Sequence, residues 1–163
     1  MQPAKDSFYI ELRNRLVAVD PQRTIVLDGA LRPAIAVLEN EPPNPTPPIC
    51  DCFLLHWGSA RLVRPSTDTL MALDCTIAYC TAGAEANAHL DRGRDLARLD
   101  NDLLAICSPA HTAKFDYSSG DPVALGSSLF WTPPALTAAK TMPPYIGREV
   151  SITLFFYPKV NQT

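Results

Sequence analysis

Hydrophobic residues near the N-terminus recur at three- and four-residue intervals, which is the period of an amphipathic helix. Asp6 or Ser7 can cap this helix, and Pro21 ends it. A second helix is predicted over residues 87–109, where Pro109 marks its end. The buried stripe of the first helix is expected to consist of Phe8, Tyr9, Leu12, Leu16 and Val19. The stripe of the second is expected to contain Leu96, Leu99, Leu103 and Ile106.

Between and after these helices, apolar runs and alternating patterns predict strands. The run that begins at Cys50 stops at Gly58, and the residues after it either continue the strand past a bulge or form a loop. The longest run carries little charge on either face, so we expect it to lie inside a sheet. The predicted strands cover residues 24–29, 33–40, 50–58, 69–83 and 148–158.

Two helices cannot cover both faces of such a sheet evenly. We therefore predict an α+β fold, with a mostly antiparallel sheet, two main helices packed on one face, and long Pro-rich loops. Residues 1–163 are expected to form a single domain. Within it we expect a Pro-rich arm at 41–49 and an irregular insertion at 110–147, in which only 127–134 has a strand pattern.

The charge balance disfavours one class of partner. The chain has 14 Lys and Arg residues against 17 Asp and Glu residues, a net charge of −3, and its basic residues are spread thinly. Nucleic-acid binding through phosphate contacts is therefore not expected. No long apolar run and no secretory signal is visible, so we expect a soluble protein with no membrane association. Five cysteines without an export signal are then expected to be reduced thiols in a cytosol.

Four of these cysteines could be drawn as a zinc site. Structural zinc takes cysteine pairs two to four residues apart on turns that let both sulfurs converge. Cys50 and Cys52 instead share one face of an extended segment, and Cys75 and Cys80 point to opposite faces of theirs. We therefore expect small buried hydrophobic residues here, with no metal and no cofactor bound.

Known catalytic motifs are missing from the sequence. It contains no G-x-S-x-G, H-E-x-x-H or C-x-x-C pattern, and its three histidines are scattered. No nucleophile, base and orienting group can be assembled from neighbouring positions. The expectation is a protein that is not an enzyme and has no catalytic residues.

The stretch "ENEPPNPTPPICDC" (39–52) concentrates prolines beside two cysteines. It contains P-x-x-P spacings, but its neighbours are Glu39, Glu41 and Asp51 rather than the basic residues that usually orient a signalling ligand. We interpret it as a stiff extended arm that contacts a neighbouring subunit. The candidate interface residues are Pro42, Pro43, Pro45, Pro47, Pro48, Trp57, Arg61, Arg64 and Tyr145.

The whole order of elements carries a family resemblance. An N-terminal amphipathic helix precedes "TIVLDG" and "PAIAVLEN", and "TLMALDCTIAYCTAG", "DRGRDLARLDNDLLAI" and "GREVSITLFFYP" follow. This order resembles the tail terminator proteins of long-tailed bacteriophages and prophages, and the related tail-completion and minor tail proteins. The resemblance covers most of the chain except 110–147.

The resemblance implies a structural protein that forms a ring with copies of itself, typically a hexamer. Such a ring caps the tail tube protein, stops its polymerisation and joins it to the head–tail connector protein. It would lie in the bacterial cytoplasm during assembly and then in the virion tail. We hypothesise that the proline arm and the 132–147 loop set the rotation between subunits, on which ring closure depends.

Two other functions stay open on the sequence. One is a small-molecule or peptide-binding α+β module, with Trp57, Trp131 and Tyr145 lining a pocket. The other is a small hydrolase whose catalytic groups converge in space rather than in sequence.

Overall fold

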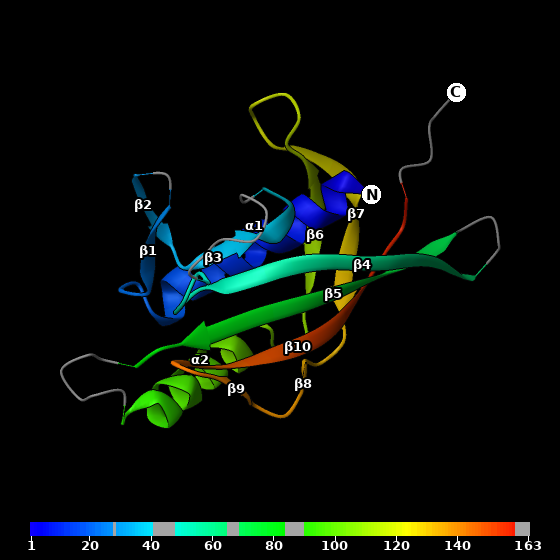
Figure 1. Cartoon of the computed structure of the whole chain (residues 1–163). Coiled ribbons are helices and arrows are strands. Elements are labelled where there is room, and N and C mark those ends of the chain that lie inside the picture. The colour runs from blue at the N-terminus through cyan, green and yellow to red at the C-terminus, as the bar shows by residue number, and fades with distance from the viewer. Residues whose placement is uncertain (28, 41–47, 65–68, 84–89, 159–163) are drawn as a thin grey trace.

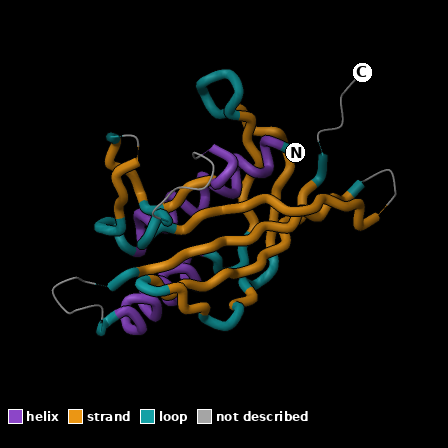
Figure 2. Tube along the Cα trace, viewed as in Figure 1, coloured by secondary structure: helices purple, strands orange, loops and turns teal. Residues whose placement is uncertain are grey.

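The computed structural model describes residues 1–27, 29–40, 48–64, 69–83 and 90–158, without the side chain of Arg64. In these residues two α-helices pack against a curled, mostly antiparallel sheet, and loops join the elements (Figures 1 and 2). The predicted α+β fold class is confirmed. Strands β4, β5 and β10 form the front of the sheet in Figure 1, and the helices lie behind them.

Helix α1 (Gln2–Val19) begins earlier than predicted. Proline favours the first turn of a helix, and Pro3 stands there, so Met1 rather than Asp6 or Ser7 is the capping residue. Ser7 instead lies inside the helix, where its hydroxyl accepts a hydrogen bond from the Phe115 N–H at 2.9 Å. The predicted stripe is confirmed at Phe8, Leu12 and Leu16, which are fully buried. It is wrong at Val19, which is exposed.

Helix α2 (Arg92–Ile106) is shorter than the predicted 87–109, of which residues 87–89 lie outside the described part of the chain. Its four predicted core residues, Leu96, Leu99, Leu103 and Ile106, are all buried. Polar contacts also join α2 to the sheet. The Asp100 carboxylate accepts a hydrogen bond of 2.6 Å from the Tyr79 hydroxyl and lies 3.2 Å from the Arg148 Nε.

The main sheet has the order β3-β4-β5-β10-β7-β6, and two short strands pair with β10. Only β3 and β4 are parallel among the pairs in the described residues. The strand bounds are β3 (Ile35–Val37), β4 (Phe53–Arg64), β5 (Leu70–Thr81), β6 (His111–Asp116), β7 (Val123–Trp131), β8 (Ala135–Leu136), β9 (Lys140–Met142) and β10 (Tyr145–Phe156).

The central strands follow their sequence patterns. Strand β5 lies between β4 and β10, as its low charge on both faces predicted. Strand β4 continues beyond Gly58 through a register shift between Trp57 and Ala60, so the bulge interpretation is confirmed. The predicted strand at 33–40 is shorter, because β3 gives way to a 3-10 turn, η1 (Leu38–Asn40).

The prediction of an irregular insertion at 110–147 is wrong. This segment contains β6, β7, β8 and β9, and β6 and β7 pair over most of their length. The sequence pattern failed because these strands lie at the end of the sheet and only three of the fifteen side chains in β6 and β7 are buried. A register shift between Ala113 and Phe115 also breaks their alternation.

A separate two-stranded hairpin joins β1 (Thr24–Leu27) to β2 (Ala30–Pro33). Figure 1 shows it at the edge of the molecule, away from α2. Ile25 and Leu27 pack against a small group of buried residues, the hairpin cluster, which consists of Ala34, Ala36 and Cys52. The opposite face of the hairpin carries Val26 and Leu31, which are cross-strand neighbours and remain exposed.

Both helices and the inner face of the main sheet enclose one larger hydrophobic cluster, the main core. Phe8 of α1 lies at its centre, with ring centroids 6.3 Å from Trp57 and 5.2 Å from Trp131 in edge-to-face geometry. The alternation predicted for the last strand is confirmed, because Val150, Ile152, Leu154 and Phe156 of β10 are all buried in this core. The main core therefore holds α1, α2 and the sheet together as one frame.

Candidate functional site

The predicted interface residues do not form one patch in the described structure. Pro42, Pro43, Pro45 and Pro47, and the side chain of Arg64, lie outside the described residues. Of the others, Pro48 is exposed, Tyr145 is half-buried opposite Met142 at the start of β10, and Arg61 lies on β4. Trp57 is only 6% exposed and belongs to the main core.

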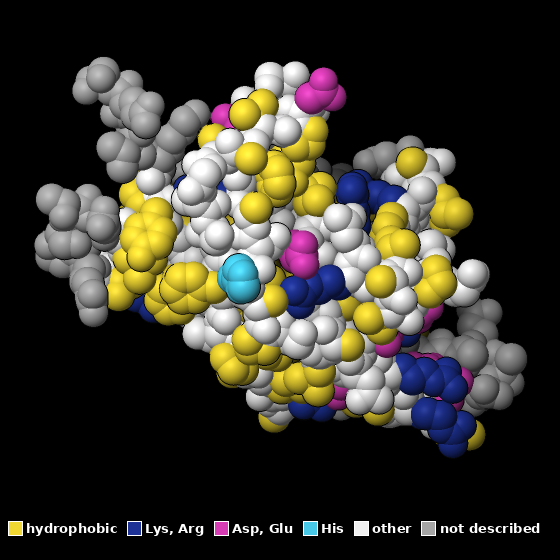
Figure 3. Space-filling view, turned by 180° about the vertical axis from the view of Figure 1, so that it is seen from behind, with side chains coloured by type: hydrophobic (Ala, Val, Ile, Leu, Met, Phe, Trp, Pro, Cys, Tyr) yellow, Lys and Arg dark blue, Asp and Glu magenta, His cyan; other side chains and the backbone are white. Residues whose placement is uncertain are grey.

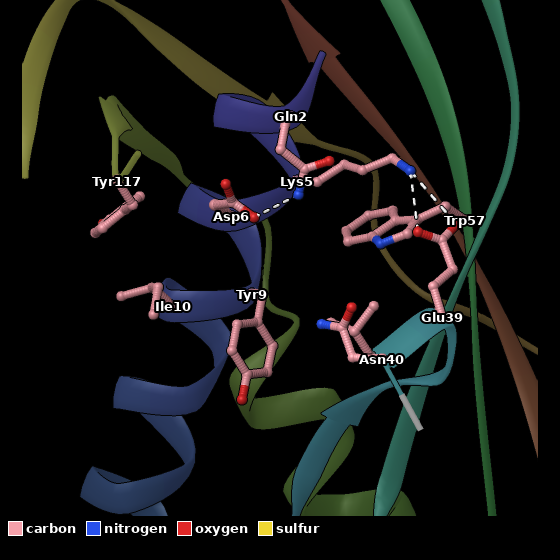
Figure 4. Close-up of a pocket in the computed structure, with 10 residues that line it drawn as sticks. Gln2, Lys5, Asp6, Tyr9, Ile10, Glu39, Asn40, Trp57 and Tyr117 are labelled. Atoms are coloured by element: carbon pink, nitrogen blue, oxygen red, sulfur yellow. Dashed lines mark hydrogen bonds and ion pairs between the residues drawn. The ribbon is translucent and has the colours of Figure 1, made fainter. Parts of the chain in front are cut away.

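Trp57 instead helps to form a groove beside α1, which we call the α1 groove (Figure 4). One wall is the outward face of the first three turns of α1. Residues three and four apart lie on the same face of a helix, so residues 2, 5, 6, 9 and 10 line this wall together. The opposite wall comes from β3, η1 and β4, and the segment after β6 contributes Tyr117. The cavity volume is about 330 Å³. Its lining residues are Gln2, Lys5, Asp6, Tyr9, Ile10, Val37, Glu39, Asn40, Trp57 and Tyr117.

Lys5 connects the two walls of the α1 groove. Its ammonium group lies 3.5 Å from the Glu39 carboxylate and 5.3 Å from the centre of the Trp57 ring. The indole face attracts a cation, so Lys5 and Trp57 hold one another in place. On the same helix the Gln2 amide donates a hydrogen bond of 2.7 Å to Asp6. These contacts give the groove a defined polar rim around an aromatic wall.

The Trp57 indole N–H is a hydrogen-bond donor at the edge of the α1 groove. Within the described residues nothing accepts a hydrogen bond from it, and its nitrogen lies on the ring edge toward Asn40 and Tyr9 (Figure 4). Tyr9 and Tyr117 add two further aromatic side chains to the groove. An aromatic surface with an indole donor suits a ligand that presents carbonyl groups and apolar rings.

The α1 groove lies at one end of the Pro-rich stretch. Asn40 lines the groove, and the first of the clustered prolines, Pro42, follows two residues later. At the other end, Pro48 lines a second cavity of about 190 Å³ on the far side of the sheet, together with Cys80 and Arg148. The described residues on either side of the clustered prolines, Asn40 and Pro48, therefore line two different concave surfaces of the protein.

The pocket expected for a binding module is only partly present. Trp131 is buried, its indole N–H donates to the Cys107 carbonyl at 3.1 Å, and it does not line the α1 groove. Tyr145 does not line it either. Tyr9 was assigned to the helix core and Tyr117 to the irregular insertion. One sequence signal for the groove was available. The polar residues Gln2, Lys5 and Asp6 lie on the helix face opposite the buried stripe of α1, and they line the groove.

The face of β4, β5 and β10 that points away from the helices, the open face, carries a polar network around Asp74. The carboxylate accepts hydrogen bonds from Arg61 at 2.7 Å, from Ser59 at 2.9 Å and from Thr153 at 3.1 Å. The Arg61 bond in particular lowers the pKa of Asp74 below its ordinary value of 3.8. Arg61 is thus held within its own chain.

The core thiols Cys75 and Cys107 are in environments that suppress reactivity. Burial raises the pKa of Cys107 to about 12 and raises that of Cys75 further, and a thiol must ionise to act as a nucleophile or metal ligand. In the described part of the chain, no three His, Cys, Asp or Glu side chains are placed to hold a metal ion together. Of the helices described here, none combines enough length and apolar character to cross a lipid bilayer.

Charged and apolar side chains gather in different places on the back of the molecule. In Figure 3 the Lys, Arg, Asp and Glu side chains concentrate at the lower right, and larger hydrophobic groups lie toward the left edge. Phe130 of β7 is an exposed aromatic residue, and its ring stacks on the ring of Phe155 with a centroid distance of 5.2 Å.

Comparison with known proteins did not identify a family for this chain. No protein-family model matches the chain, and no curated protein matches its sequence.

Proposed function

We propose that this protein is a structural assembly protein of the tail terminator or tail-completion class of a long-tailed bacteriophage or prophage. Its copies associate into a ring that caps the tail tube and contacts the head–tail connector. In that ring, the Pro-rich stretch of one copy docks in the α1 groove of the next. The observation that carries the proposal is an aromatic groove in which the described residues leave the Trp57 indole N–H without an acceptor, in a chain that also contains a Pro-rich stretch.

The chemistry of the two surfaces is complementary. Proline has no N–H to donate, so an extended Pro-rich segment offers carbonyl acceptors and flat rings. Grooves that bind such segments use aromatic side chains for the rings and hydrogen-bond donors for the carbonyls. Trp57, Tyr9 and Tyr117 supply the aromatic surface, and the Trp57 N–H supplies the donor.

The stiffness of the ligand favours association. A segment that is already extended loses little conformational entropy when it docks, so a small groove can hold it. A contact between two different surfaces of identical subunits is heterologous, and such contacts close into rings when the rotation per subunit is right. The architecture supports the same proposal, because the order on which the resemblance rests, an N-terminal helix, a long strand that leads into a helix and a final strand, is present as α1, β5, α2 and β10.

Light scattering on the purified full chain tests the proposal. We expect a concentration-dependent oligomer, visible as rings by electron microscopy. Replacing Pro42, Pro45 and Pro48 together by alanine, or making Tyr117→Ala, should raise the concentration needed for assembly about tenfold or more. Matched controls are Pro122→Ala and Tyr157→Ala, which change exposed residues outside the groove and outside the 132–147 loop and should leave assembly unchanged.

A variant that combines the three proline replacements with Tyr117→Ala distinguishes a direct contact from two unrelated effects. If the prolines dock against Tyr117, the loss in the combined variant should be smaller than the sum of the separate losses. A wild-type chain that stays monomeric at every concentration would overturn the ring. An oligomer that none of the groove variants changes would overturn the docking contact.

The α1 groove also supports a second candidate, a module that binds a small molecule or a peptide from another protein. Its volume of about 330 Å³ is at the lower end of the ~300–1,000 Å³ that ligand pockets have. This function predicts a stable monomer whose thermal unfolding midpoint rises when a synthetic Pro-rich peptide is added, with the rise abolished by Tyr117→Ala.

A further inference from the structure

Two cysteines that are far apart in the sequence meet where the Pro-rich stretch ends. The Cys50 sulfur lies 3.4 Å from the Cys80 sulfur, and both thiols are free. The backbone holds them there, because the Asp51 N–H donates a hydrogen bond of 2.7 Å to the Cys80 carbonyl. Asp51 has a positive φ of 56°, a conformation that Asp tolerates better than most residues. The contact is therefore built by the turn at residues 50–52.

The end of β5 also leaves room for this contact. Cys80 pairs with Gly147 of β10. A Cβ atom at Gly147 would lie 2.8 Å from the Tyr79 carbonyl oxygen and 2.9 Å from the Cys80 Cβ, closer than real contacts allow. Only glycine lets β10 approach here without displacing Cys80 from its place beside Cys50.

The pair differs from the other three cysteines in its access to solvent. Cys52, Cys75 and Cys107 are buried in the hairpin cluster or the main core. Cys50 is half-buried, and Cys80 is 9% exposed and lines the cavity on the open side of the sheet. A small reagent can therefore reach the pair through Cys50.

We infer that Cys50 and Cys80 are a modification site at which a small disulfide such as oxidised glutathione forms a reversible cross-link between the end of the Pro-rich stretch and strand β5. A disulfide bond is about 2.05 Å long, so the two sulfurs need to approach by about 1.4 Å. The inference does not depend on the proposed function, because the contact lies within one chain.

The reaction balances in two exchange steps. The Cys50 thiolate attacks one sulfur of oxidised glutathione, which releases one glutathione and leaves a mixed disulfide on Cys50. The Cys80 thiolate then attacks the Cys50 sulfur and releases the second glutathione. The protein loses two electrons and two protons, and the reagent gains the same two electrons and two protons as it becomes two thiols.

The environment of the pair makes this exchange slow at neutral pH. Burial is the main cause that raises the pKa of Cys50 to about 12, and it also raises the pKa of Cys80. Below these pKa values the thiolate fraction, and with it the rate, rises about tenfold for each unit of pH. Cross-linking therefore needs a sustained oxidising environment, and the reduced form persists in a cytosol.

The consequence is a restraint on the Pro-rich stretch. The cross-link encloses the residues between positions 50 and 80 and fixes residue 50, which lies two positions after the last clustered proline, Pro48. The cross-link should raise the midpoint of thermal unfolding by roughly 5–10 °C, because the enclosed loop loses freedom in the unfolded chain.

Peptide mapping of the full chain tests the inference. The reduced protein is incubated with oxidised glutathione at neutral and alkaline pH, remaining thiols are alkylated, and tryptic peptides are compared with and without reduction. We expect a linked pair of peptides containing Cys50 and Cys80, formed faster at the higher pH. Cys50→Ser and Cys80→Ser should each abolish it, and the control Cys52→Ala, in the same segment, should retain it.

Non-reducing gels distinguish this link from one between molecules. An intramolecular link leaves the chain at monomer mass, whether or not the protein forms rings. The inference is overturned if Cys50 and Cys80 both remain open to alkylation after prolonged oxidation, or if the product joins two chains. It is also overturned if the same linkage appears equally with Cys75 or Cys107.

Discussion

Beneath the two helices, Phe8, Leu55 and Leu103 belong to one large buried cluster that joins both helices to the sheet. Beneath the β1–β2 hairpin, by contrast, only the small side chains of the hairpin cluster are buried. The two regions therefore differ in how much apolar surface stabilises them, at about 25 cal/mol for each Å² removed from water. The two helices and the main sheet, which we call the body, form a stable frame. The β1–β2 hairpin, which we call the hairpin end, is held by few buried side chains.

The difference suggests a division of roles between the regions. A two-stranded hairpin is marginal by itself, and this one leaves Val26 at 63% and Leu31 at 71% exposure. The Cys50–Cys80 pair lies near this end, where Cys52 of the hairpin cluster follows two residues later. Changes in the body should therefore alter global stability, and changes at the hairpin end should alter contacts and local order.

The largest effect is expected from Leu103→Ala. Leu103 is fully buried in the main core, so its truncation should lower the free energy of unfolding by about 2–5 kcal/mol. Leu104→Ala is the matched control, since Leu104 is the next residue of α2 and is 43% exposed; it should change stability by less than about 0.5 kcal/mol. Urea unfolding followed by circular dichroism measures both. Equal losses for the two variants would contradict the assignment of the α2 stripe.

A smaller and pH-dependent effect is expected on the open face of the body. Because the folded-state pKa of Asp74 is lowered, its contribution to stability is present above the ordinary value of 3.8 and is lost as the pH falls through the folded-state value. The carboxylate is partly exposed to solvent, so this contribution is about 0.2–1 kcal/mol.

Asp74→Asn should therefore be less stable than the wild type at neutral pH, and the gap should close in acid. Urea unfolding across the acid range measures this. Asp95→Asn provides the comparison, because Asp95 forms an ion pair with Arg98 on the surface of α2 and has no similar network. A gap between Asp74→Asn and the wild type that widens in acid would have the wrong sign for this explanation.

The smallest effect on stability is expected at the exposed face of the hairpin. Val26→Ser with Leu31→Ser should change the free energy of unfolding by less than about 0.5 kcal/mol, because both side chains are already in water. Ile25→Ser with Leu27→Ser, on the other face, should cost more, since these residues cover the hairpin cluster. Hydrogen exchange at the hairpin amides reports the difference. Equal protection in both double variants would mean that the cluster does not hold the hairpin.

Several parts of the fold were predictable because their signal is local. The α2 stripe and the alternation of β10 each repeat within one segment, so burial of Leu99 or Ile152 follows from spacing alone. Residues 34–37 alternate in the same local way, with Ile35 in the main core and Ala36 in the hairpin cluster. Cys75 and Cys80 likewise point to opposite faces of β5.

By itself, the sequence determined the helix-backed sheet and most of the residues that fill the main core, because helix and strand periods are properties of neighbouring positions. Only the tertiary structure decided the pairing of β6 with β7, the α1 groove and the contact between Cys50 and Cys80. Each of these depends on segments that meet across dozens of residues, such as Lys5, Trp57 and Tyr117 in the groove. No local pattern records such a meeting, because it is set by how the whole sheet pairs and curls.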